Sequence, residues 1–208
     1  MDSPFSPQHL LINRPSPLQT LPPMDFADPS HFFVEHSTIT KPDLCMDNDG
    51  YCNWSSILLS NPFTSGIASV TITILSISDR SFNSGLMDST SPIPEIGEAL
   101  GYGVKNSVSL SRHGSLFFNT PSSHSVKGCT HILKEGDSVR MEVDLDSTPR
   151  TVQFFVNGEA GECCVSGIPS SVRIGFSLYG EGTSFRIDNI SRLSQPTPIS
   201  KVMREGKW

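Results

Sequence analysis

The sequence predicts an all-β protein, a sandwich of two facing antiparallel sheets. Residues 136–159 carry the strongest signal, because apolar side chains occupy every second position from Val139 to Leu145, with polar ones between them. A period of two is typical of a strand with one buried and one solvated face. Asn157-Gly158 follows a second alternating run, where a tight hairpin needs two residues of positive φ. The rest of the chain repeats short apolar runs between turn residues, and no helical period lasts three turns.

The other strands follow in chain order, each an apolar run bounded by Gly, Pro, Ser or Asn. We expect them at residues 32–40, 54–60, 69–77, 107–111, 115–119, 172–178 and 184–190. Residues 147–150 form a turn, since Pro149 presets the φ that a turn favours. Residues 78–94 are a loop rich in Ser, Gly and Pro, and 95–103 are too short and too interrupted by Gly for a long helix.

We expect one domain flanked by two tails. Residues 1–30 form a disordered leader, because repeated prolines break any helix and the apolar residues show no period. Its Ser-Pro pairs are candidates for phosphorylation, although an unmodified leader is the preferred reading; they are Ser3-Pro4, Ser6-Pro7 and Ser16-Pro17. Residues 31–193 form the sandwich, and 194–208 form a C-terminal tail.

Composition narrows the class of partner and the compartment. The chain has 208 residues, a net charge of −6 and a pI of about 5.4, which argues against nucleic acid as a main partner. No apolar run approaches the ~20 residues that a membrane helix needs. There is no secretory pattern at the N-terminus. Five irregularly spaced cysteines favour free thiols in a reducing compartment. We therefore expect a cytoplasmic monomer.

No pattern indicates catalysis, a cofactor or a metal. Residues 45–50 are spaced faintly like a calcium loop, but Cys45 stands at the first ligand position and Ser56 where a bidentate Glu belongs. Asp144 and Asp146 share one strand face, where a metal would find two carboxylates about 6–7 Å apart. A solvated strand face explains the pair more simply.

Two stretches carry a family resemblance. Residues 136–146 and 152–158 are similar to the pattern G-D-x-V-x-x-x-x-D followed by V-x-F-x-x-N-G, which is typical of the SPRY-domain family. Weaker matches extend the resemblance over residues 54–190, at 66–74, 96–101, 107–116, 174–178 and 185–187. Val108 stands where the family usually has Trp, and 66–74 lack the family's Trp and Glu. The chain thus resembles a divergent SPRY domain.

The resemblance implies a concanavalin-like sandwich of two bent antiparallel sheets, whose rim loops bind a peptide or protein without catalysis or a cofactor. Exposed aromatic and Arg side chains are the best anchors in such loops, because they bury large areas at modest entropic cost. The predicted loops hold four candidates: Tyr102, Arg112, His113 and Tyr179. Ordinary surface positions remain an alternative for them. Trp54 is expected in the core, and Phe155 faces outward or packs beneath a neighbouring segment.

The sequence therefore favours a non-catalytic protein-interaction module. A glycan-binding, lectin-like sandwich is the alternative, with Asp144 and Asp146 as its only hint of a metal site. A hydrolase on a similar sandwich is a third reading. It requires two carboxylates about 5–9.5 Å apart across a cleft, whereas Glu142, Asp144 and Asp146 lie on one strand.

Overall fold

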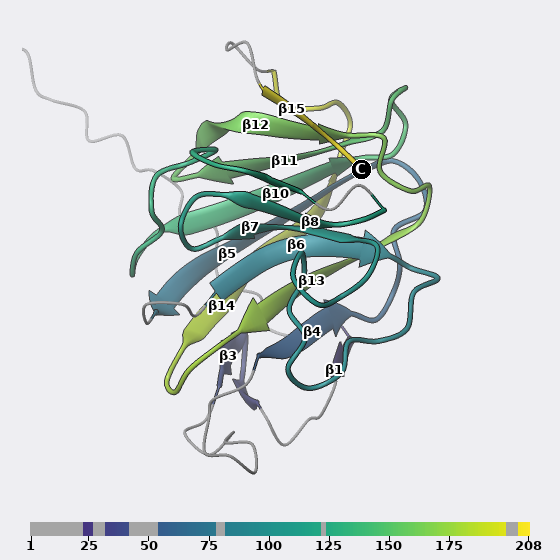
Figure 1. The fold of residues 1–208 in the computed structure, drawn as a ribbon. Coiled ribbons are helices and arrows are strands. Elements are labelled where there is room, and N and C mark those ends of the chain that lie inside the picture. The colour runs from purple at the N-terminus through teal and green to yellow at the C-terminus, as the bar shows by residue number, and fades with distance from the viewer. Residues whose placement is uncertain (1–22, 27–31, 42–53, 78–81, 122–123, 199–203) are drawn as a thin grey trace, which may run out of the picture.

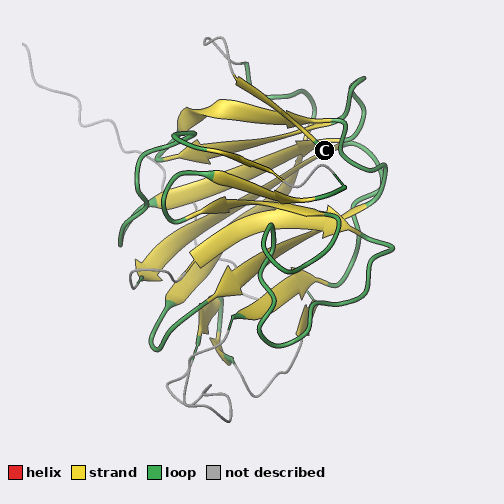
Figure 2. Cartoon of the chain, in the orientation of Figure 1, coloured by secondary structure: helices red, strands yellow, loops and turns green. Residues whose placement is uncertain are grey.

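The computed structural model describes residues 23–26, 32–41, 54–77, 82–121, 124–198 and 204–208. These residues form two facing sheets and no helix, so the predicted all-β sandwich is confirmed (Figures 1 and 2). Among them, no helix is long or apolar enough to cross a membrane. The predicted Pro-rich leader up to residue 22 and the calcium-like stretch at 45–50 lie outside the described residues.

The seven-stranded sheet has the order β1-β4-β13-β6-β7-β8-β9. Its strands are β1 (Met24–Phe26), β4 (Ser55–Leu59), β13 (Val172–Leu178), β6 (Phe82–Asp88), β7 (Ser107–Ser111), β8 (Leu116–Asn119) and β9 (His124–Val126). The eight-stranded sheet has the order β15-β12-β11-β10-β5-β14-β3-β2. Its strands are β15 (Arg204–Lys207), β12 (Glu159–Ser166), β11 (Thr151–Val156), β10 (Ser138–Asp144), β5 (Ile67–Ser76), β14 (Ser184–Leu193), β3 (Thr38–Thr40) and β2 (Phe33–Glu35).

Neighbouring strands run antiparallel except β12 and β15, which pair in parallel from Cys163↔Arg204 to Ser166↔Lys207. A parallel pair needs a long connection, and here β13 and β14 come between β12 and β15 in the sequence, with β15 at one edge of the sheet. Three strands lie in segments that were predicted to hold none: β15 in the predicted C-terminal tail, β1 in the predicted leader, and β6 in the predicted loop 78–94. All three are paired with the sandwich, β1 through Met24↔Leu59 and β6 through Leu178↔Phe82. The domain bounds 31–193 stay a prediction.

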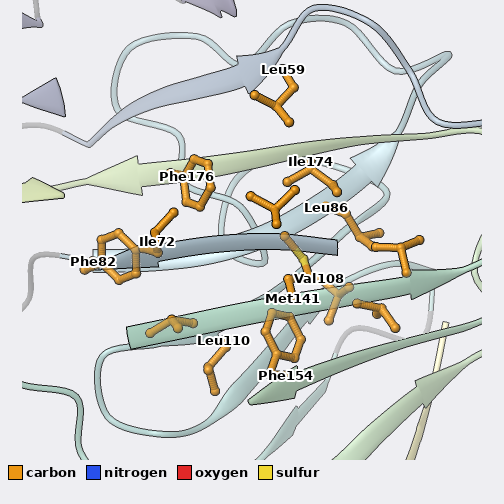
Figure 3. Packing of buried hydrophobic residues seen from close by; sticks show 14 of the residues in the cluster. Leu59, Ile72, Phe82, Leu86, Val108, Leu110, Met141, Phe154, Ile174 and Phe176 are labelled. Atoms are coloured by element: carbon orange, nitrogen blue, oxygen red, sulfur yellow. The ribbon is translucent and has the colours of Figure 1, made fainter. Parts of the chain in front are cut away.

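Alternating apolar side chains from both sheets fill the space between them (Figure 3). Three phenylalanines join the sheets, because Phe185 of β14 packs on Phe82 and Phe176 of β6 and β13. The ring centroid of Phe185 lies 4.6 Å from that of Phe176 and 5.8 Å from that of Phe82. Aromatic pairs at such separations add to the stability that burial alone provides.

The predicted Asn157-Gly158 turn is confirmed between β11 and β12, with φ of 54° and 84°. Asn157 also supports the strand beside it. Its Oδ1 accepts a hydrogen bond from the Ser138 amide at 2.9 Å, and its Nδ2 donates one to Asp137 Oδ1 at 2.8 Å. The turn therefore ties the start of β10 to the end of β11.

The polar face of β10 was predicted to lie in water, and that prediction is wrong for two of its carboxylates. Glu142 and Asp144 are only 5% and 8% exposed. The segment that follows β14 covers Glu142, which accepts hydrogen bonds from Thr197 N at 2.7 Å and Thr197 Oγ1 at 2.6 Å. Arg140 pairs with Glu142 at 2.6 Å and lies over the ring of Phe155, 3.6 Å from its centroid. Phe155 is therefore buried beneath an arginine on the outer face.

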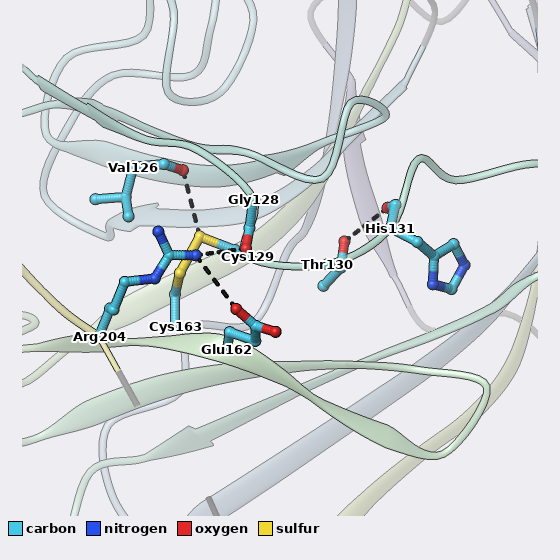
Figure 4. Close-up of a disulfide and its surroundings, with 8 residues drawn as sticks. All are labelled: Val126, Gly128, Cys129, Thr130, His131, Glu162, Cys163 and Arg204. Atoms are coloured by element: carbon cyan, nitrogen blue, oxygen red, sulfur yellow. Dashed lines mark hydrogen bonds and ion pairs between the residues drawn. A yellow bond between two sulfur atoms is a disulfide. The ribbon is translucent and has the colours of Figure 1, made fainter. Parts of the chain in front are cut away.

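A disulfide joins Cys129 to Cys163, whose Cα atoms are 5.1 Å apart (Figure 4). The prediction of free thiols is wrong for these two residues. Cys129 follows β9 of one sheet and Cys163 lies in β12 of the other, so the pairing arises from tertiary folding across 34 residues and leaves no trace in local spacing. Cys164 is a free thiol. Burial, and then the nearby Glu205 carboxylate, raise the pKa of the Cys164 thiol.

Replacing Thr197 with Val removes the hydroxyl group that donates a hydrogen bond to the buried Glu142 carboxylate. We expect the free energy of unfolding to fall by about 1–3 kcal/mol, as for other buried groups that lose a partner. Urea denaturation measures the change. Thr197→Ser keeps the hydroxyl and is expected to behave like the wild type, so an equal loss in both variants contradicts this role.

Candidate functional site

One pocket of about 400 Å³ opens at the rim of the sandwich, and we call it the rim pocket. Its aromatic walls are Trp54, Phe82, Tyr102 and Phe117. Its polar walls are Asn83, Ser111, Arg112 and His113. The residues come from the start of β4, from β6, from the β6–β7 connection, and from β7, β8 and the turn between them. Segments far apart in sequence therefore converge on one concave surface.

Three of the four predicted site residues, Tyr102, Arg112 and His113, line this pocket. The fourth, Tyr179, lies at the end of β13 and contacts Trp54, with ring centroids 5.4 Å apart. Tyr102 is 69% exposed, an unusual position for so large an apolar side chain. The fold thus brings all four candidates to one place, and their role in binding stays a prediction.

The loop that carries Tyr102 is fixed by buried polar side chains. Leu100, two residues earlier, is fully buried, and its carbonyl oxygen accepts hydrogen bonds from Asn83 Nδ2 at 3.1 Å and Ser109 Oγ at 2.7 Å. The Leu100 amide donates to Ser177 Oγ at 3.0 Å. Tyr102 also exchanges two backbone hydrogen bonds with Ala99, both of 2.9 Å. Each bond satisfies a group that would be costly to bury alone.

The serines of β7 alternate with apolar residues, and all three of them, Ser107, Ser109 and Ser111, are buried. The connection between β6 and β7 covers this face of the sheet, as the contacts of Ser107 Oγ with Gly101 N and Val104 O demonstrate. A small hydroxyl suits this position because the covering backbone approaches closely.

The turn after β7 presents the cationic side of the rim pocket. The Arg112 amide donates to Phe82 O at 2.9 Å, and the Arg112 carbonyl oxygen accepts from the Leu133 amide at 2.8 Å. Both backbone groups of Arg112 are therefore held by neighbouring segments. Ser111 Oγ, in the pocket wall, is buried and has no hydrogen-bond partner within the described part of the chain.

Trp54 and Phe117 line the rim pocket but were not predicted as site residues. Trp54 was expected in the core, but it is half-buried and lines the rim pocket from the residue before β4. Every residue of β4 itself is buried, which leaves the preceding side chain at the boundary. Phe117 of β8 is also half-buried in the pocket wall. The position of Trp54, a large aromatic side chain just before a strand, could have indicated a place at the boundary of the core.

A second, smaller pocket of about 290 Å³ lies beside the disulfide, lined in part by Cys129, His131 and Glu162. Near it, the buried Asp137 accepts a hydrogen bond from the Lys134 amide at 3.0 Å. Burial raises the pKa of Asp137, but hydrogen bonds from Asn157 and Lys134 and the nearby His131 outweigh it. The net pKa lies below its usual range.

The carboxylates considered for metal binding serve turns instead. Asp144 Oδ1 accepts the amides of Asp146 and Ser147, both at 3.0 Å. Asp146 Oδ1 accepts the Gly66 amide at 2.7 Å. Across the residues that the structure describes, no three His, Cys, Asp or Glu side chains gather as a metal site would require.

No protein-family model and no curated protein matches this chain. Solved structures do resemble it. The SPRY domain of human HERC1 has a TM-score of 0.56 at 17% identity, over 83% of this chain and 100% of that one. The TRIM65 PSpry domain has a TM-score of 0.55 at 14% identity, over 79% and 88%. The Emp47p carbohydrate recognition domain has a TM-score of 0.50 at 15% identity, over 84% and 91%.

These likenesses define the class of fold, a SPRY-like sandwich that lectin-like domains share. At such identities they establish the arrangement of strands alone.

Gly101 positions the Tyr102 loop, because its φ is 73° and an added Cβ would lie 2.5 Å from the Phe117 carbonyl oxygen. Gly182 has a similar φ of 71° with open space around it, so it is a matched control. We expect Gly182→Ala to cost about 1–2 kcal/mol from backbone strain. Gly101→Ala should cost a further 1–3 kcal/mol, roughly the penalty of overpacking. Equal costs in urea denaturation would contradict close packing of this loop.

Asp137→Asn should reveal a pH-dependent contribution to stability. A carboxylate with a depressed folded pKa stabilises the protein above its unfolded pKa of about 3.9 and loses that contribution as the pH falls through the folded value. We expect the variant to unfold about 1–3 kcal/mol more easily at neutral pH, with the gap closing below about pH 4. Urea titrations at several pH values measure it, with the exposed Glu159→Gln as control. A gap of constant size would refute the assignment.

Proposed function

We propose that this domain is a non-catalytic protein-interaction module that binds a short peptide or a protein surface in the rim pocket. One observation carries the proposal: Tyr102, Arg112 and His113, chosen from the sequence for their binding chemistry, line one pocket. The fourth candidate, Tyr179, packs against Trp54 of the pocket wall. The four candidates come from three separate connections of the sandwich. Binding residues are often carried by loops that a rigid scaffold positions.

The pocket's chemistry supports a peptide ligand. Trp54 and Tyr102 offer aromatic surface, while Arg112 and His113 offer donors beside it. Aromatic and arginine side chains dominate the binding energy of protein interfaces. A volume of about 400 Å³ is in the range of ligand pockets and admits one or two side chains.

The backbone around the pocket is held before any ligand arrives. The Tyr102 loop is bonded to Asn83, Ser109 and Ser177 through Leu100. A preorganised site loses little conformational entropy on binding, which favours affinity. We propose that the module acts as a monomer in the cytoplasm, as the sequence analysis expects.

A glycan is the second candidate ligand, favoured by the likeness to the Emp47p carbohydrate recognition domain and by the aromatic pocket wall. Carboxylates that might have held a metal are engaged elsewhere: Asp144 and Asp146 bind backbone amides, and Glu142 binds Thr197. The peptide reading is therefore preferred over both the glycan and the hydrolase readings.

Capture of partners from a cell extract tests the proposal. We expect a variant with Tyr102→Ala, Arg112→Ala and Tyr179→Ala to lose the partners that the wild type retains, because truncated anchors each cost about 2 kcal/mol or more. Circular dichroism and urea denaturation establish that the variant folds. Val34→Ala with Leu75→Ala alters two exposed apolar side chains outside the pocket and is the control.

Partner sets that do not change in the pocket variant would refute the site. A glycan array, read with and without EDTA, separates the two candidate ligands. Retention of a glycan by the wild type, lost in the pocket variant, would replace the peptide reading by the lectin reading.

A further inference from the structure

The disulfide and the rim pocket are connected by a short run of backbone contacts. Cys129 begins the segment 129–133, and this segment packs against the turn 111–114 that carries Arg112 and His113. The amides of Cys129 and Thr130 donate to Gly114 O at 2.7 and 3.1 Å, and the Leu133 amide donates to Arg112 O. An added Cβ at Gly114 would lie 2.3 Å from Thr130 O, so the two segments are in close contact.

On its other side, the segment is fixed to the eight-stranded sheet by the disulfide to Cys163 of β12 (Figure 4). Two further contacts join the same pieces. The Glu162 amide donates to Cys129 O at 2.6 Å. Arg204 of β15 donates to Gly128 O and lies 3.6 Å from Glu162. Arg204 and Glu162 are 52% and 66% exposed, so water screens their attraction, and the covalent bond is the main tether.

We propose that the Cys129–Cys163 bond is a redox latch on the rim pocket: its formation fixes the segment 129–133, and through it the turn that presents Arg112 and His113. For its consequence in binding, this inference rests on the proposed function. In a reducing compartment, the bond is open at rest and closes under oxidation, which is the usual behaviour of disulfides in such compartments. The closed bond preorganises the cationic wall of the pocket and strengthens binding.

Both directions are thiol–disulfide exchange. In closure, the Cys129 thiolate attacks glutathione disulfide, forms a mixed disulfide and expels one glutathione thiolate; the Cys163 thiolate then attacks Cys129 Sγ and expels the second, so that the oxidant leaves as two glutathione thiols. Opening is the reverse exchange with a dithiol. A dithiol such as dithiothreitol attacks Cys129 Sγ as a thiolate, forms a mixed disulfide and expels the Cys163 thiolate; its second thiol then releases Cys129. Two electrons and two protons pass to the protein, and the reductant leaves as a cyclic disulfide. Cys129 lines the small pocket, and both cysteines are 2% exposed, so we expect the exchange to need a local opening of this segment. Cys129 Sγ lies 3.3 Å from Val126 O, which would accept a hydrogen bond from the thiol.

Cys164 does not compete for the bond. It follows Cys163 in β12, where consecutive side chains point to opposite faces of the sheet. Its raised pKa keeps it a thiol rather than a thiolate at neutral pH. Cys164→Ser is therefore a matched control that removes one cysteine and retains the latch.

Hydrogen exchange of the full chain, read by mass spectrometry, tests the latch without a ligand. Wild type oxidised with glutathione disulfide is compared with wild type reduced by dithiothreitol, and the mass gain of two hydrogens confirms reduction. We expect exchange at 111–114 and 129–133 to accelerate about tenfold or more on reduction, as local opening breaks their backbone bonds. Strands β5 and β10 should keep their protection.

Two cysteine variants separate the effect of the Cys129–Cys163 bond from other effects of dithiothreitol. Cys164→Ser should respond to dithiothreitol like the wild type, and Cys129→Ser with Cys163→Ser should exchange rapidly whether or not dithiothreitol is present. Unchanged exchange at 111–114 in fully reduced protein overturns the latch. Wild type that does not form the Cys129–Cys163 bond after treatment with glutathione disulfide also overturns the latch. Faster exchange throughout β5 and β10 also overturns it, because the bond is then a general structural support.

The effect of the disulfide on partner binding is measured in a separate experiment from hydrogen exchange. Partner capture is repeated with the oxidised wild type and with the double cysteine variant, which we expect to retain about tenfold less partner, the effect of roughly 1.4 kcal/mol. If the variant lacking Tyr102, Arg112 and Tyr179 captures the wild-type partners, the proposed function fails while the exchange data still decide the latch. Equal capture by oxidised wild type and double cysteine variant, with the site confirmed, overturns the regulatory claim.

Discussion

The rim pocket depends on one constraint: the hydroxyls of Ser109 and Ser177, on a covered sheet face, hydrogen-bond to the backbone of a single loop. The connection between β6 and β7 lies over β7 and β13, so the hydroxyls of Ser109 and Ser177 are removed from water. Both bind the backbone of Leu100, which fixes the loop two residues before Tyr102. An unpaired buried group would cost about 1–3 kcal/mol, so the pairing effectively selects one loop conformation. The exposed position of Tyr102 follows from this requirement.

A similar requirement shapes the outer face of the other sheet. The segment that follows β14 covers Glu142, and Thr197 supplies donors to the buried carboxylate. Arg140 completes the arrangement by pairing with Glu142 while it covers Phe155. A charge buried without such partners would be strongly destabilising.

Features that depend on residues close together in the sequence could be predicted, whereas features that depend on distant segments could not. The Asn157-Gly158 turn and the alternation in β10 and β11 are local, and both could be predicted. The burial of Glu142 and of the β7 serines, and the pairing of Cys129 with Cys163, depend on segments that fold over from distant positions. Local periodicity cannot report which faces such segments will cover.

The candidate site divides in the same way. Tyr102, Arg112, His113 and Tyr179 could be selected because large aromatic and cationic side chains in loops suit binding. Their convergence could not be predicted, since it depends on the order of strands in the sheet. Trp54 was missed because an aromatic beside an apolar strand is usually core. Here the strand is already fully buried, so Trp54 lies at its edge, where it lines the pocket and contacts the ring of Tyr179.

The pocket's two walls are held by different kinds of restraint. Side-chain hydrogen bonds from three strands hold the aromatic wall at Tyr102, and these bonds do not involve the disulfide. Backbone hydrogen bonds to the segment 129–133 hold the cationic wall at Arg112 and His113, and that segment is bonded covalently to β12. A change at the disulfide therefore acts first on the cationic wall. If the rim pocket binds a ligand as proposed, its aromatic contacts would persist while its polar contacts weaken, because the two walls are restrained independently.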